Sequence, residues 1–220
     1  MSTVQQDFDR IALVSTEGAT QNDHYHNFLL RHLPRQCDDG LEIGCGTGAF
    51  SRRLAERFQH VTALDLSPEM IHLACKYSAH LSNIEFQLGD IRDRTLAAES
   101  FDCIASIATL HHLPYREMLL KMKAALRPGG VLLVLDLFEP TGLSDSVTNV
   151  LAIALSVSLR LFHHGRLLRP RVEREAWSGH ERHDSYLTTS AMRKLCAEIL
   201  PGAQVRKHLL WRYSIIWEKG

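Results

Sequence analysis

The sequence shows no excess of charge of either sign and no cysteine pattern typical of metal or disulfide sites. Its 220 residues include 25 Lys and Arg and 25 Asp and Glu, so the formal net charge is +0. A strong basic excess usually accompanies nucleic-acid binding, so we expect no nucleic acid as a partner. No two of the 5 cysteines are spaced as C-x-x-C, and His163 and His164 have no third ligand at a plausible spacing, so we predict no metal site.

Long apolar runs are also missing. Residues 1–10 are polar and acidic, and they lack the apolar stretch of a secretory signal. The most apolar segment, residues 147–162, is interrupted and is shorter than the about 20 residues of a membrane-spanning helix. Without a signal, a span or a disulfide framework, the expected compartment is the reducing cytoplasm.

Between residues 40 and 137, apolar runs typical of strands alternate with segments of helical periodicity. The spacing predicts strands over 40–43, 60–65, 84–88, 101–107 and 131–137, and helices over 50–58, 68–78 and 115–126. Ser67 and Pro68 are typical of an N-cap and a first helical position. Such alternation implies parallel strands with right-handed crossovers, hence a doubly wound α/β sheet with helices on both faces.

The end of the chain follows a different pattern. A helix is expected over 188–200, and strands over 204–210 and 213–217. Only two residues separate these strands, too few for a helical crossover, so they should pair antiparallel. We therefore predict a Rossmann-like, seven-stranded sheet with one antiparallel strand. Residues 1–220 would form a single domain, in which 141–187 is a small helical lid insertion.

A glycine-rich loop follows the first expected strand. Gly44, Gly46 and Gly48 permit a tight turn and close approach of a ligand, and the next helix offers free N–H groups and partial positive charge. The loop also satisfies the loose dinucleotide pattern G-x-G-x-x-G/A. Asp65, at the end of the second strand, could accept hydrogen bonds from the ribose hydroxyls of either cofactor class. A nicotinamide-dependent oxidoreductase therefore stays open at this point.

Three further features favour an adenosyl amino acid as the cofactor. Glu42 precedes the first glycine, where a carboxylate suits a cationic amino acid group and would repel a pyrophosphate. Asp90, after the third strand, could accept from an adenine amine. The two closely linked terminal strands also place one strand antiparallel in the sheet.

These motifs, in this order, resemble the class I S-adenosylmethionine-dependent methyltransferases, of the type that acts on small molecules. The resemblance extends over roughly residues 20 to 140 and rests on residues 41–48, 63–70, 89–91, 101–104, 110–113 and 126–130. It is specific for the fold and the cofactor, and it says little about the methyl acceptor. It implies S-adenosylmethionine as the cofactor and S-adenosylhomocysteine as its product.

The resemblance also implies which residues contact the cofactor. The glycine loop would border the methionine part, Asp65 would hold the ribose, and Ile107 would lie near the amino acid end. A short N-terminal helix over 23–27 would close over the site. The complete implied set is Tyr25, Glu42, Gly44, Cys45, Gly46, Gly48, Asp65, Leu66, Met70, Asp90, Ile91 and Ile107.

Methyl transfer from a sulfonium mainly requires alignment, and a general base helps when the acceptor is a hydroxyl or an ammonium. His111 and His112 follow the fourth strand, at the edge where open α/β sheets bind ligands. The alternative is that this pair caps and packs the following helix. His183, in the segment before the last expected helix, is a further catalytic candidate.

The insertion contains an apolar stretch, residues 147–162, followed by a basic one. A lid helix, an apolar acceptor pocket and a homodimer face all fit this pattern. Neighbouring glutamates dilute the basic charge, which argues against peripheral membrane contact. The leading hypothesis is methylation of a small, partly apolar acceptor. The alternatives are an NAD(P)-dependent oxidoreductase and a non-catalytic S-adenosylmethionine-binding protein.

Overall fold

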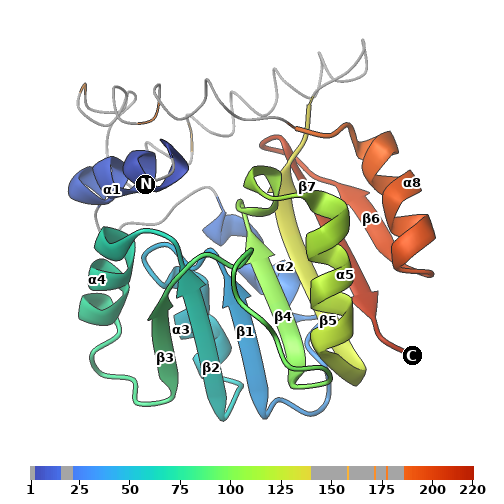
Figure 1. The fold of residues 1–220 in the computed structure, drawn as a ribbon, viewed down its shortest axis with the longest axis horizontal. Coiled ribbons are helices and arrows are strands. Elements are labelled where there is room, and N and C mark those ends of the chain that lie inside the picture. Colours follow the sequence, from blue (N-terminus) through green and yellow to red (C-terminus); the bar gives the residue numbers. More distant parts are fainter. Residues whose placement is uncertain (1–2, 16–21, 140–157, 159–170, 172–176, 178–185) are drawn as a thin grey trace.

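The computed structural model describes residues 3–15, 22–139, 158, 171, 177 and 186–220 (Figure 1). Seven strands form one sheet in the order β3-β2-β1-β4-β5-β7-β6. Strand β7 runs antiparallel to both of its neighbours, β5 and β6, and the other pairings in the sheet are parallel. The strands are β1 (Asp39–Ile43), β2 (His60–Asp65), β3 (Ile84–Leu88), β4 (Phe101–Ile107), β5 (Leu126–Leu137), β6 (Gln204–Lys207) and β7 (Arg212–Glu218). The predicted Rossmann-like sheet with one antiparallel strand is confirmed.

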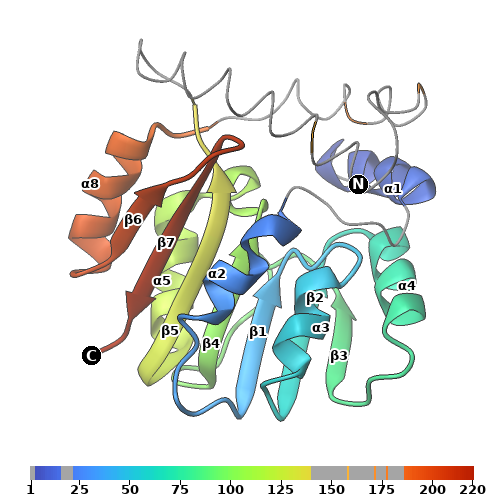
Figure 2. The same cartoon turned by 180° about the vertical axis from the view of Figure 1, so that it is seen from behind.

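Helices cover both faces of this sheet. One face carries α2 and α3, and the opposite face carries α5 and α8 (Figures 1 and 2). The helices are α1 (Thr3–Val14), α2 (His26–Leu30), α3 (Ala49–Ala55), α4 (Pro68–Tyr77), α5 (Tyr115–Ala125) and α8 (Thr189–Ile199), with short 3-10 turns η1 (Asp23–Tyr25) and η2 (Leu110–His112). In the described part of the chain, no helix is both long enough and apolar enough to cross a membrane.

The central strands are apolar on both faces because helices bury both. Along β5, Leu132 and Val134 belong to the cluster that packs under α5 and α8. Leu133 and Leu135 point the other way and join the cluster around α2 and α3. Successive side chains of a strand face opposite sides, so a strand covered on both faces reads as one continuous apolar run.

Two helix starts follow their sequence signals. The Ser67 hydroxyl accepts the Met70 N–H at 3.1 Å, with Pro68 opening α4. The Thr188 hydroxyl accepts the Ala191 N–H at 3.2 Å at the start of α8. Each cap provides a partner for an N–H group that has no acceptor within its helix.

Some boundaries differ from those expected. Strand β5 begins at Leu126 rather than 131, because Leu126 already pairs with Phe101 before the register shifts over a turn in which Gly129 has φ +77°. Strand β6 ends at Lys207 rather than 210. Leu210 and Trp211 both have φ +57°, which takes them out of the strand and into a turn.

The sequence did not lead us to expect helix α1. It lies above the carboxyl ends of the strands and packs on α4 (Figure 1). Ile11 and Ala12 of α1 are buried against Met70, with Phe8 and Trp177 at the border of this cluster. Most of the predicted lid insertion, including the candidate His183, lies outside the described residues.

Candidate functional site

The glycine loop lies at the point where the strand order reverses, between β1, β2 and β4. Gly44, Gly46 and Gly48 have φ of +75°, +52° and +75°, a region that L-residues rarely adopt. A Cβ at Gly44 would stand 2.0 Å from the Thr109 hydroxyl oxygen, and one at Gly48 would stand 3.0 Å from the Phe86 ring. These two glycines therefore allow close approach to neighbouring elements.

Gly46 differs from these two glycines, because a Cβ built there meets no atom within 4 Å. A bound molecule can therefore approach the backbone of Gly46 on the side where a Cβ would stand. The loop itself is held by β2: the N–H groups of Gly44 and Cys45 both donate to the Leu64 carbonyl, at 2.8 and 3.0 Å. The backbone of the loop is thus fixed by its hydrogen bonds to β2.

Asp65 ties the loop to the start of α4. Its Oδ2 accepts the Gly46 N–H at 2.8 Å and its Oδ1 accepts the Ser67 N–H at 2.9 Å. Burial raises the pKa of Asp65, and the backbone hydrogen bonds oppose that rise. An ionised carboxylate offers about four lone-pair positions, and the backbone N–H groups of Gly46, Ser67 and Leu66 all bond to this one, so at least one position remains for a ribose hydroxyl. This residue therefore fits the predicted ribose contact.

Glu42 is a second buried carboxyl beside the loop. It is 2% exposed, and Ser51 of α3 donates to its Oε2 at 2.5 Å. Burial raises the pKa of Glu42 to about 8. A cationic group nearby would favour the ionised form, since an opposite charge stabilises a buried carboxylate. This arrangement suits the predicted contact with an amino acid ammonium.

A strained turn follows β4. Ala108 has φ +50°, and its N–H donates to the Leu135 carbonyl of β5 at 2.7 Å. Thr109, which abuts Gly44, donates its hydroxyl to the Ile107 carbonyl at 3.0 Å. A non-glycine residue at positive φ persists only where its surroundings hold it, and such residues concentrate at functional sites. This turn places η2, with His111 and His112, beside the glycine loop.

His111 is bound to a buried carboxylate. Its Nδ1 lies 2.6 Å from Oδ1 of Asp136, which is 0% exposed, and the Leu137 N–H donates to the same oxygen at 2.9 Å. The His112 ring lies against that of His111, with centroids 3.8 Å apart. Asp136 of β5 therefore fixes the His111 ring, and the His112 ring packs on it.

The rings extend into a row across the carboxyl edge of the sheet. Phe8 of α1 lies edge-on to His112, with centroids 5.7 Å apart. Tyr186 lies 5.1 Å from His111 at the other end. This row of rings joins α1, η2 and the segment that precedes α8. Its aromatic side chains lie above the carboxyl ends of the strands.

Three other predicted cofactor contacts, Leu66, Asp90 and Ile91, follow the carboxyl ends of β2 and β3. Asp90 follows β3, where the neighbouring Gly89 N–H donates to the Asp65 carbonyl at 2.9 Å. Arg92 binds the Asp90 carboxylate, with Nε at 2.9 Å from Oδ2, and this hydrogen bonding lowers the pKa of Asp90. Ile91 is buried in the cluster under α5, and Leu66 is partly buried at the end of β2.

Tyr25 and Ile107 lie on the α2 face, in the same apolar cluster. The Tyr25 hydroxyl donates to the Leu209 carbonyl at 2.7 Å, and burial raises the pKa of this tyrosine. The short helix expected over 23–27 corresponds to η1 and the first residues of α2. Tyr25 is therefore directed toward the turn between β6 and β7, and its contact with the cofactor stays a prediction.

Sequence reasoning missed two participants at this edge. Asp9 of α1 accepts the Ser67 hydroxyl at 2.5 Å, and Asp136 holds His111. Phe8, Ile11 and Ala12 stand at the i, i+3, i+4 spacing of an amphipathic helix, which was the available signal for α1. For Asp136, the signal was a charged residue within an otherwise apolar strand.

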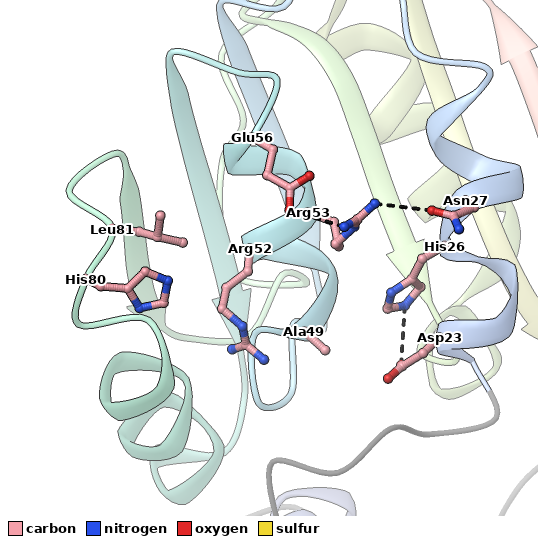
Figure 3. A pocket seen from close by; sticks show the side chains of 9 residues that line it. All are labelled: Asp23, His26, Asn27, Ala49, Arg52, Arg53, Glu56, His80 and Leu81. Carbon is pink, nitrogen blue, oxygen red and sulfur yellow. Dashed lines mark hydrogen bonds and ion pairs between the residues drawn. The ribbon is translucent and has the colours of Figure 1, made fainter. Parts of the chain in front are cut away.

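A hollow of about 690 Å³ lies elsewhere, along the outer face of α3 (Figure 3). Most of its charged side chains bind neighbouring groups: Arg53 donates to Glu56 and to Asn27, each at 3.2 Å, Arg52 donates to the Thr47 carbonyl at 2.9 Å, and His26 lies 3.5 Å from Asp23. It is lined by Asp23, His26, Asn27, Ala49, Arg52, Arg53, Glu56, His80 and Leu81. None of these residues belongs to the glycine loop or to the histidine pair.

The comparisons with known proteins agree with this geometry. The family model described as a methyltransferase domain matches residues 41–130. An uncharacterized methyltransferase of Mycobacterium bovis is 27% identical over 201 residues, 89% of this chain and 94% of the relative. The ubiquinone biosynthesis O-methyltransferase of Xanthomonas campestris is 31% identical over 143 residues, 62% of this chain and 59% of the relative.

Among solved structures, the N-methyltransferase NodS of Bradyrhizobium japonicum, in complex with S-adenosyl-L-homocysteine, has a TM-score of 0.66. It is 18% identical, and the match covers 99% of both chains. Together, the sheet topology, the glycine loop and these similarities show a methyltransferase domain over residues 41–130 within the fold of class I S-adenosylmethionine-dependent methyltransferases. S-adenosylmethionine is its cofactor, and neither an oxidoreductase nor a non-catalytic binding protein is favoured.

Proposed function

We propose that this enzyme methylates a small, partly apolar molecule at a hydroxyl or amino group. The acceptor would bind at the carboxyl edge of the sheet, between α1 and η2. The aromatic row from Phe8 to Tyr186 supports an acceptor with an apolar or planar part. The relatives also support a small acceptor, since one of them is an O-methyltransferase of ubiquinone biosynthesis.

The cofactor supplies an activated methyl group on a sulfonium. The chain must therefore bind the cofactor, align the acceptor with the methyl group and exclude water. We assign the backbone of Gly44, Gly46 and Gly48 to the amino acid end, with Glu42 facing its ammonium. Asp65 is assigned to the ribose hydroxyls, and Met70, beneath α1, to the adenine side.

The remaining contacts of the predicted set complete this proposal. Leu66, Asp90 and Ile91 follow the carboxyl ends of β2 and β3, where they would border the adenine. Cys45 lies within the glycine loop, and Tyr25 and Ile107 would close the site from the α2 face.

The observation that carries the proposal is the hydrogen bond from His111 to a buried carboxylate, with His112 against the same ring. Acceptor hydroxyl and ammonium groups must lose a proton during transfer, and histidine is suited to accept one near neutral pH. A histidine pair held this firmly, beside a glycine loop, supports proton acceptance at His112 or His111. The alternative role, packing of the helix that follows, needs no buried carboxylate.

The proposal is tested by incubating the enzyme with labelled S-adenosylmethionine and fractionated metabolite extracts, then identifying labelled products by mass spectrometry. A labelled small molecule with a new O-methyl or N-methyl group is the expected result. Labelling confined to protein or nucleic acid fractions would contradict the proposal. A product methylated at carbon or sulfur would contradict the proposed acceptor group.

We also propose that residues 1–220 act as one domain, whose insertion over 141–187 faces the acceptor. The catalytic candidate His183 belongs to that insertion, outside the described residues. Cytoplasmic location and a homodimer formed through the insertion are further proposals. Cell fractionation tests the first, and the mass of the purified enzyme by light scattering tests the second.

A further inference from the structure

Asp136 is a carboxylate in an apolar setting. It stands near the carboxyl end of β5, and its side chain points to the same face as Val134 and Phe138, both of which belong to the large apolar cluster. The residue is 0% exposed. Burying a carboxylate costs several kcal/mol unless hydrogen bonds or an opposite charge compensate for the lost water. Packing alone therefore does not explain an aspartate at this position.

The compensation comes largely from His111. Oδ1 of Asp136 accepts the neighbouring Leu137 N–H and faces Nδ1 of His111 at 2.6 Å. Oδ2 makes no hydrogen bond within the described residues. An ionised carboxylate can only accept, so Nδ1 of His111 carries the proton and Nε2 is left as the acceptor nitrogen. The carboxylate thus selects one of the two tautomers of His111.

The same strand holds the other end of the turn. Leu135, next to Asp136, accepts the N–H of the strained Ala108 at 2.7 Å. Two consecutive residues of β5 therefore fix the segment from Ala108 to His111 at both ends. Since Thr109 lies against Gly44, these contacts set the position of the histidine rings relative to the glycine loop.

We propose that Asp136 is a positioning residue for proton transfer during methylation. It holds His111 with Nδ1 as the donor, and the His111 ring in turn orients His112, whose centroid lies 3.8 Å away. The carboxylate also stabilises the positive charge that forms when the histidine pair takes up a proton. This inference rests on the proposed function, because it requires an acceptor that loses a proton.

The tautomer of His111 is measured by nuclear magnetic resonance of the enzyme carrying ¹⁵N-labelled histidine, without any acceptor. The wild type should show His111 protonated at Nδ1. Asp136→Ala removes the acceptor and should give a mixture of the two tautomers, whereas Asp136→Asn can present either its oxygen or its NH₂ group to Nδ1 and is kept for the turnover measurement. Protonation of wild-type His111 at Nε2 alone would overturn the inference. Because this arm needs no turnover, it reports on Asp136 even if the proposed acceptor chemistry fails.

The second arm measures turnover with the acceptor found in the labelling screen. Asp136→Asn should lower kcat on the order of tenfold or more, with little change in cofactor affinity or acceptor KM. Asp102→Asn is the matched control, because Asp102 is also a buried aspartate, on β4 at the opposite edge of the sheet. Equal kcat in the two variants would overturn the positioning role. If Asp136→Ala does not fold, Asp136→Asn still decides the question.

Discussion

The hydroxyl of Ser67 donates to the carboxylate of Asp9 at 2.5 Å, and it also accepts the Met70 N–H. One side chain therefore caps α4 and joins it to α1. Ser67 is also the residue whose N–H binds Asp65. The helix above the site and the residue assigned to the ribose are thus connected through a single serine.

This connection leads to a prediction about cofactor release. Asp9→Ala removes the acceptor that holds α1 over the site, and should speed dissociation of S-adenosylhomocysteine about three- to tenfold. One hydrogen bond to a charged group contributes about 1.5–3 kcal/mol, part of which is regained from water. Stopped-flow fluorescence measures the rate. Gln6→Ala, an exposed change on the same helix, should leave it unaltered, and an equal acceleration there would contradict the assignment.

Two glycines of the loop should respond differently to the same substitution. Gly44→Ala combines positive φ with a clash against Thr109, so it should destabilise the fold by ~3 kcal/mol or more. Gly46→Ala meets no atom, so it should cost only about 1–2 kcal/mol. The free energy of unfolding in urea measures both effects. Calorimetry should then show that Gly46→Ala weakens cofactor binding more than its small stability loss explains.

Asp65→Ala should weaken binding of S-adenosylmethionine by ~2–4 kcal/mol, because it removes charged acceptors assigned to two ribose hydroxyls. The dissociation constant is measured by isothermal titration calorimetry. Asp93→Ala removes an exposed carboxylate after β3 and serves as the control. An unchanged dissociation constant in a folded Asp65→Ala enzyme would refute the ribose assignment.

Glu42 predicts a pH dependence of stability. Its pKa is about 8 in the folded chain, above the ordinary value of 4.5. Between these values the unfolded chain releases the proton while the folded chain keeps it, so stability falls as pH rises through this window. The loss should be on the order of a few kcal/mol and absent in Glu42→Gln. Urea unfolding of both proteins at pH 5 and pH 8 measures it; parallel pH profiles would contradict the prediction.

His112→Ala should lower kcat by ~10²-fold or more and spare cofactor affinity, if His112 accepts the proton. Rapid-quench turnover at saturating substrate measures the effect. His80→Ala changes an exposed histidine far from the row and is the control. A loss of activity that follows unfolding alone would instead support the packing role of the pair. A larger loss in His111→Ala than in His112→Ala would move the base to His111.

Local patterns were enough to predict most of the framework. Strand β2 was predicted with its observed bounds, and Ser67 was predicted as a helix cap, because each signal depends only on neighbours along the chain. Burial on both faces makes the parallel strands continuously apolar, which is visible without coordinates. The boundary of β5 was wrong by five residues. Pairing with β4 extends the strand through Gly129, whereas the sequence around that glycine resembles a break.

The sequence by itself determined the sheet, the glycine loop and the order of the acidic residues around it, and these are enough to indicate the cofactor. Only the tertiary structure decided which side chains contact one another at the carboxyl ends of the strands. Asp136 and His111 are 25 positions apart and Asp9 and Ser67 are 58 apart, so no local periodicity relates them. Their contacts depend on how β5 lies beside β4 and how α1 crosses α4, which is a result of packing rather than of local pattern.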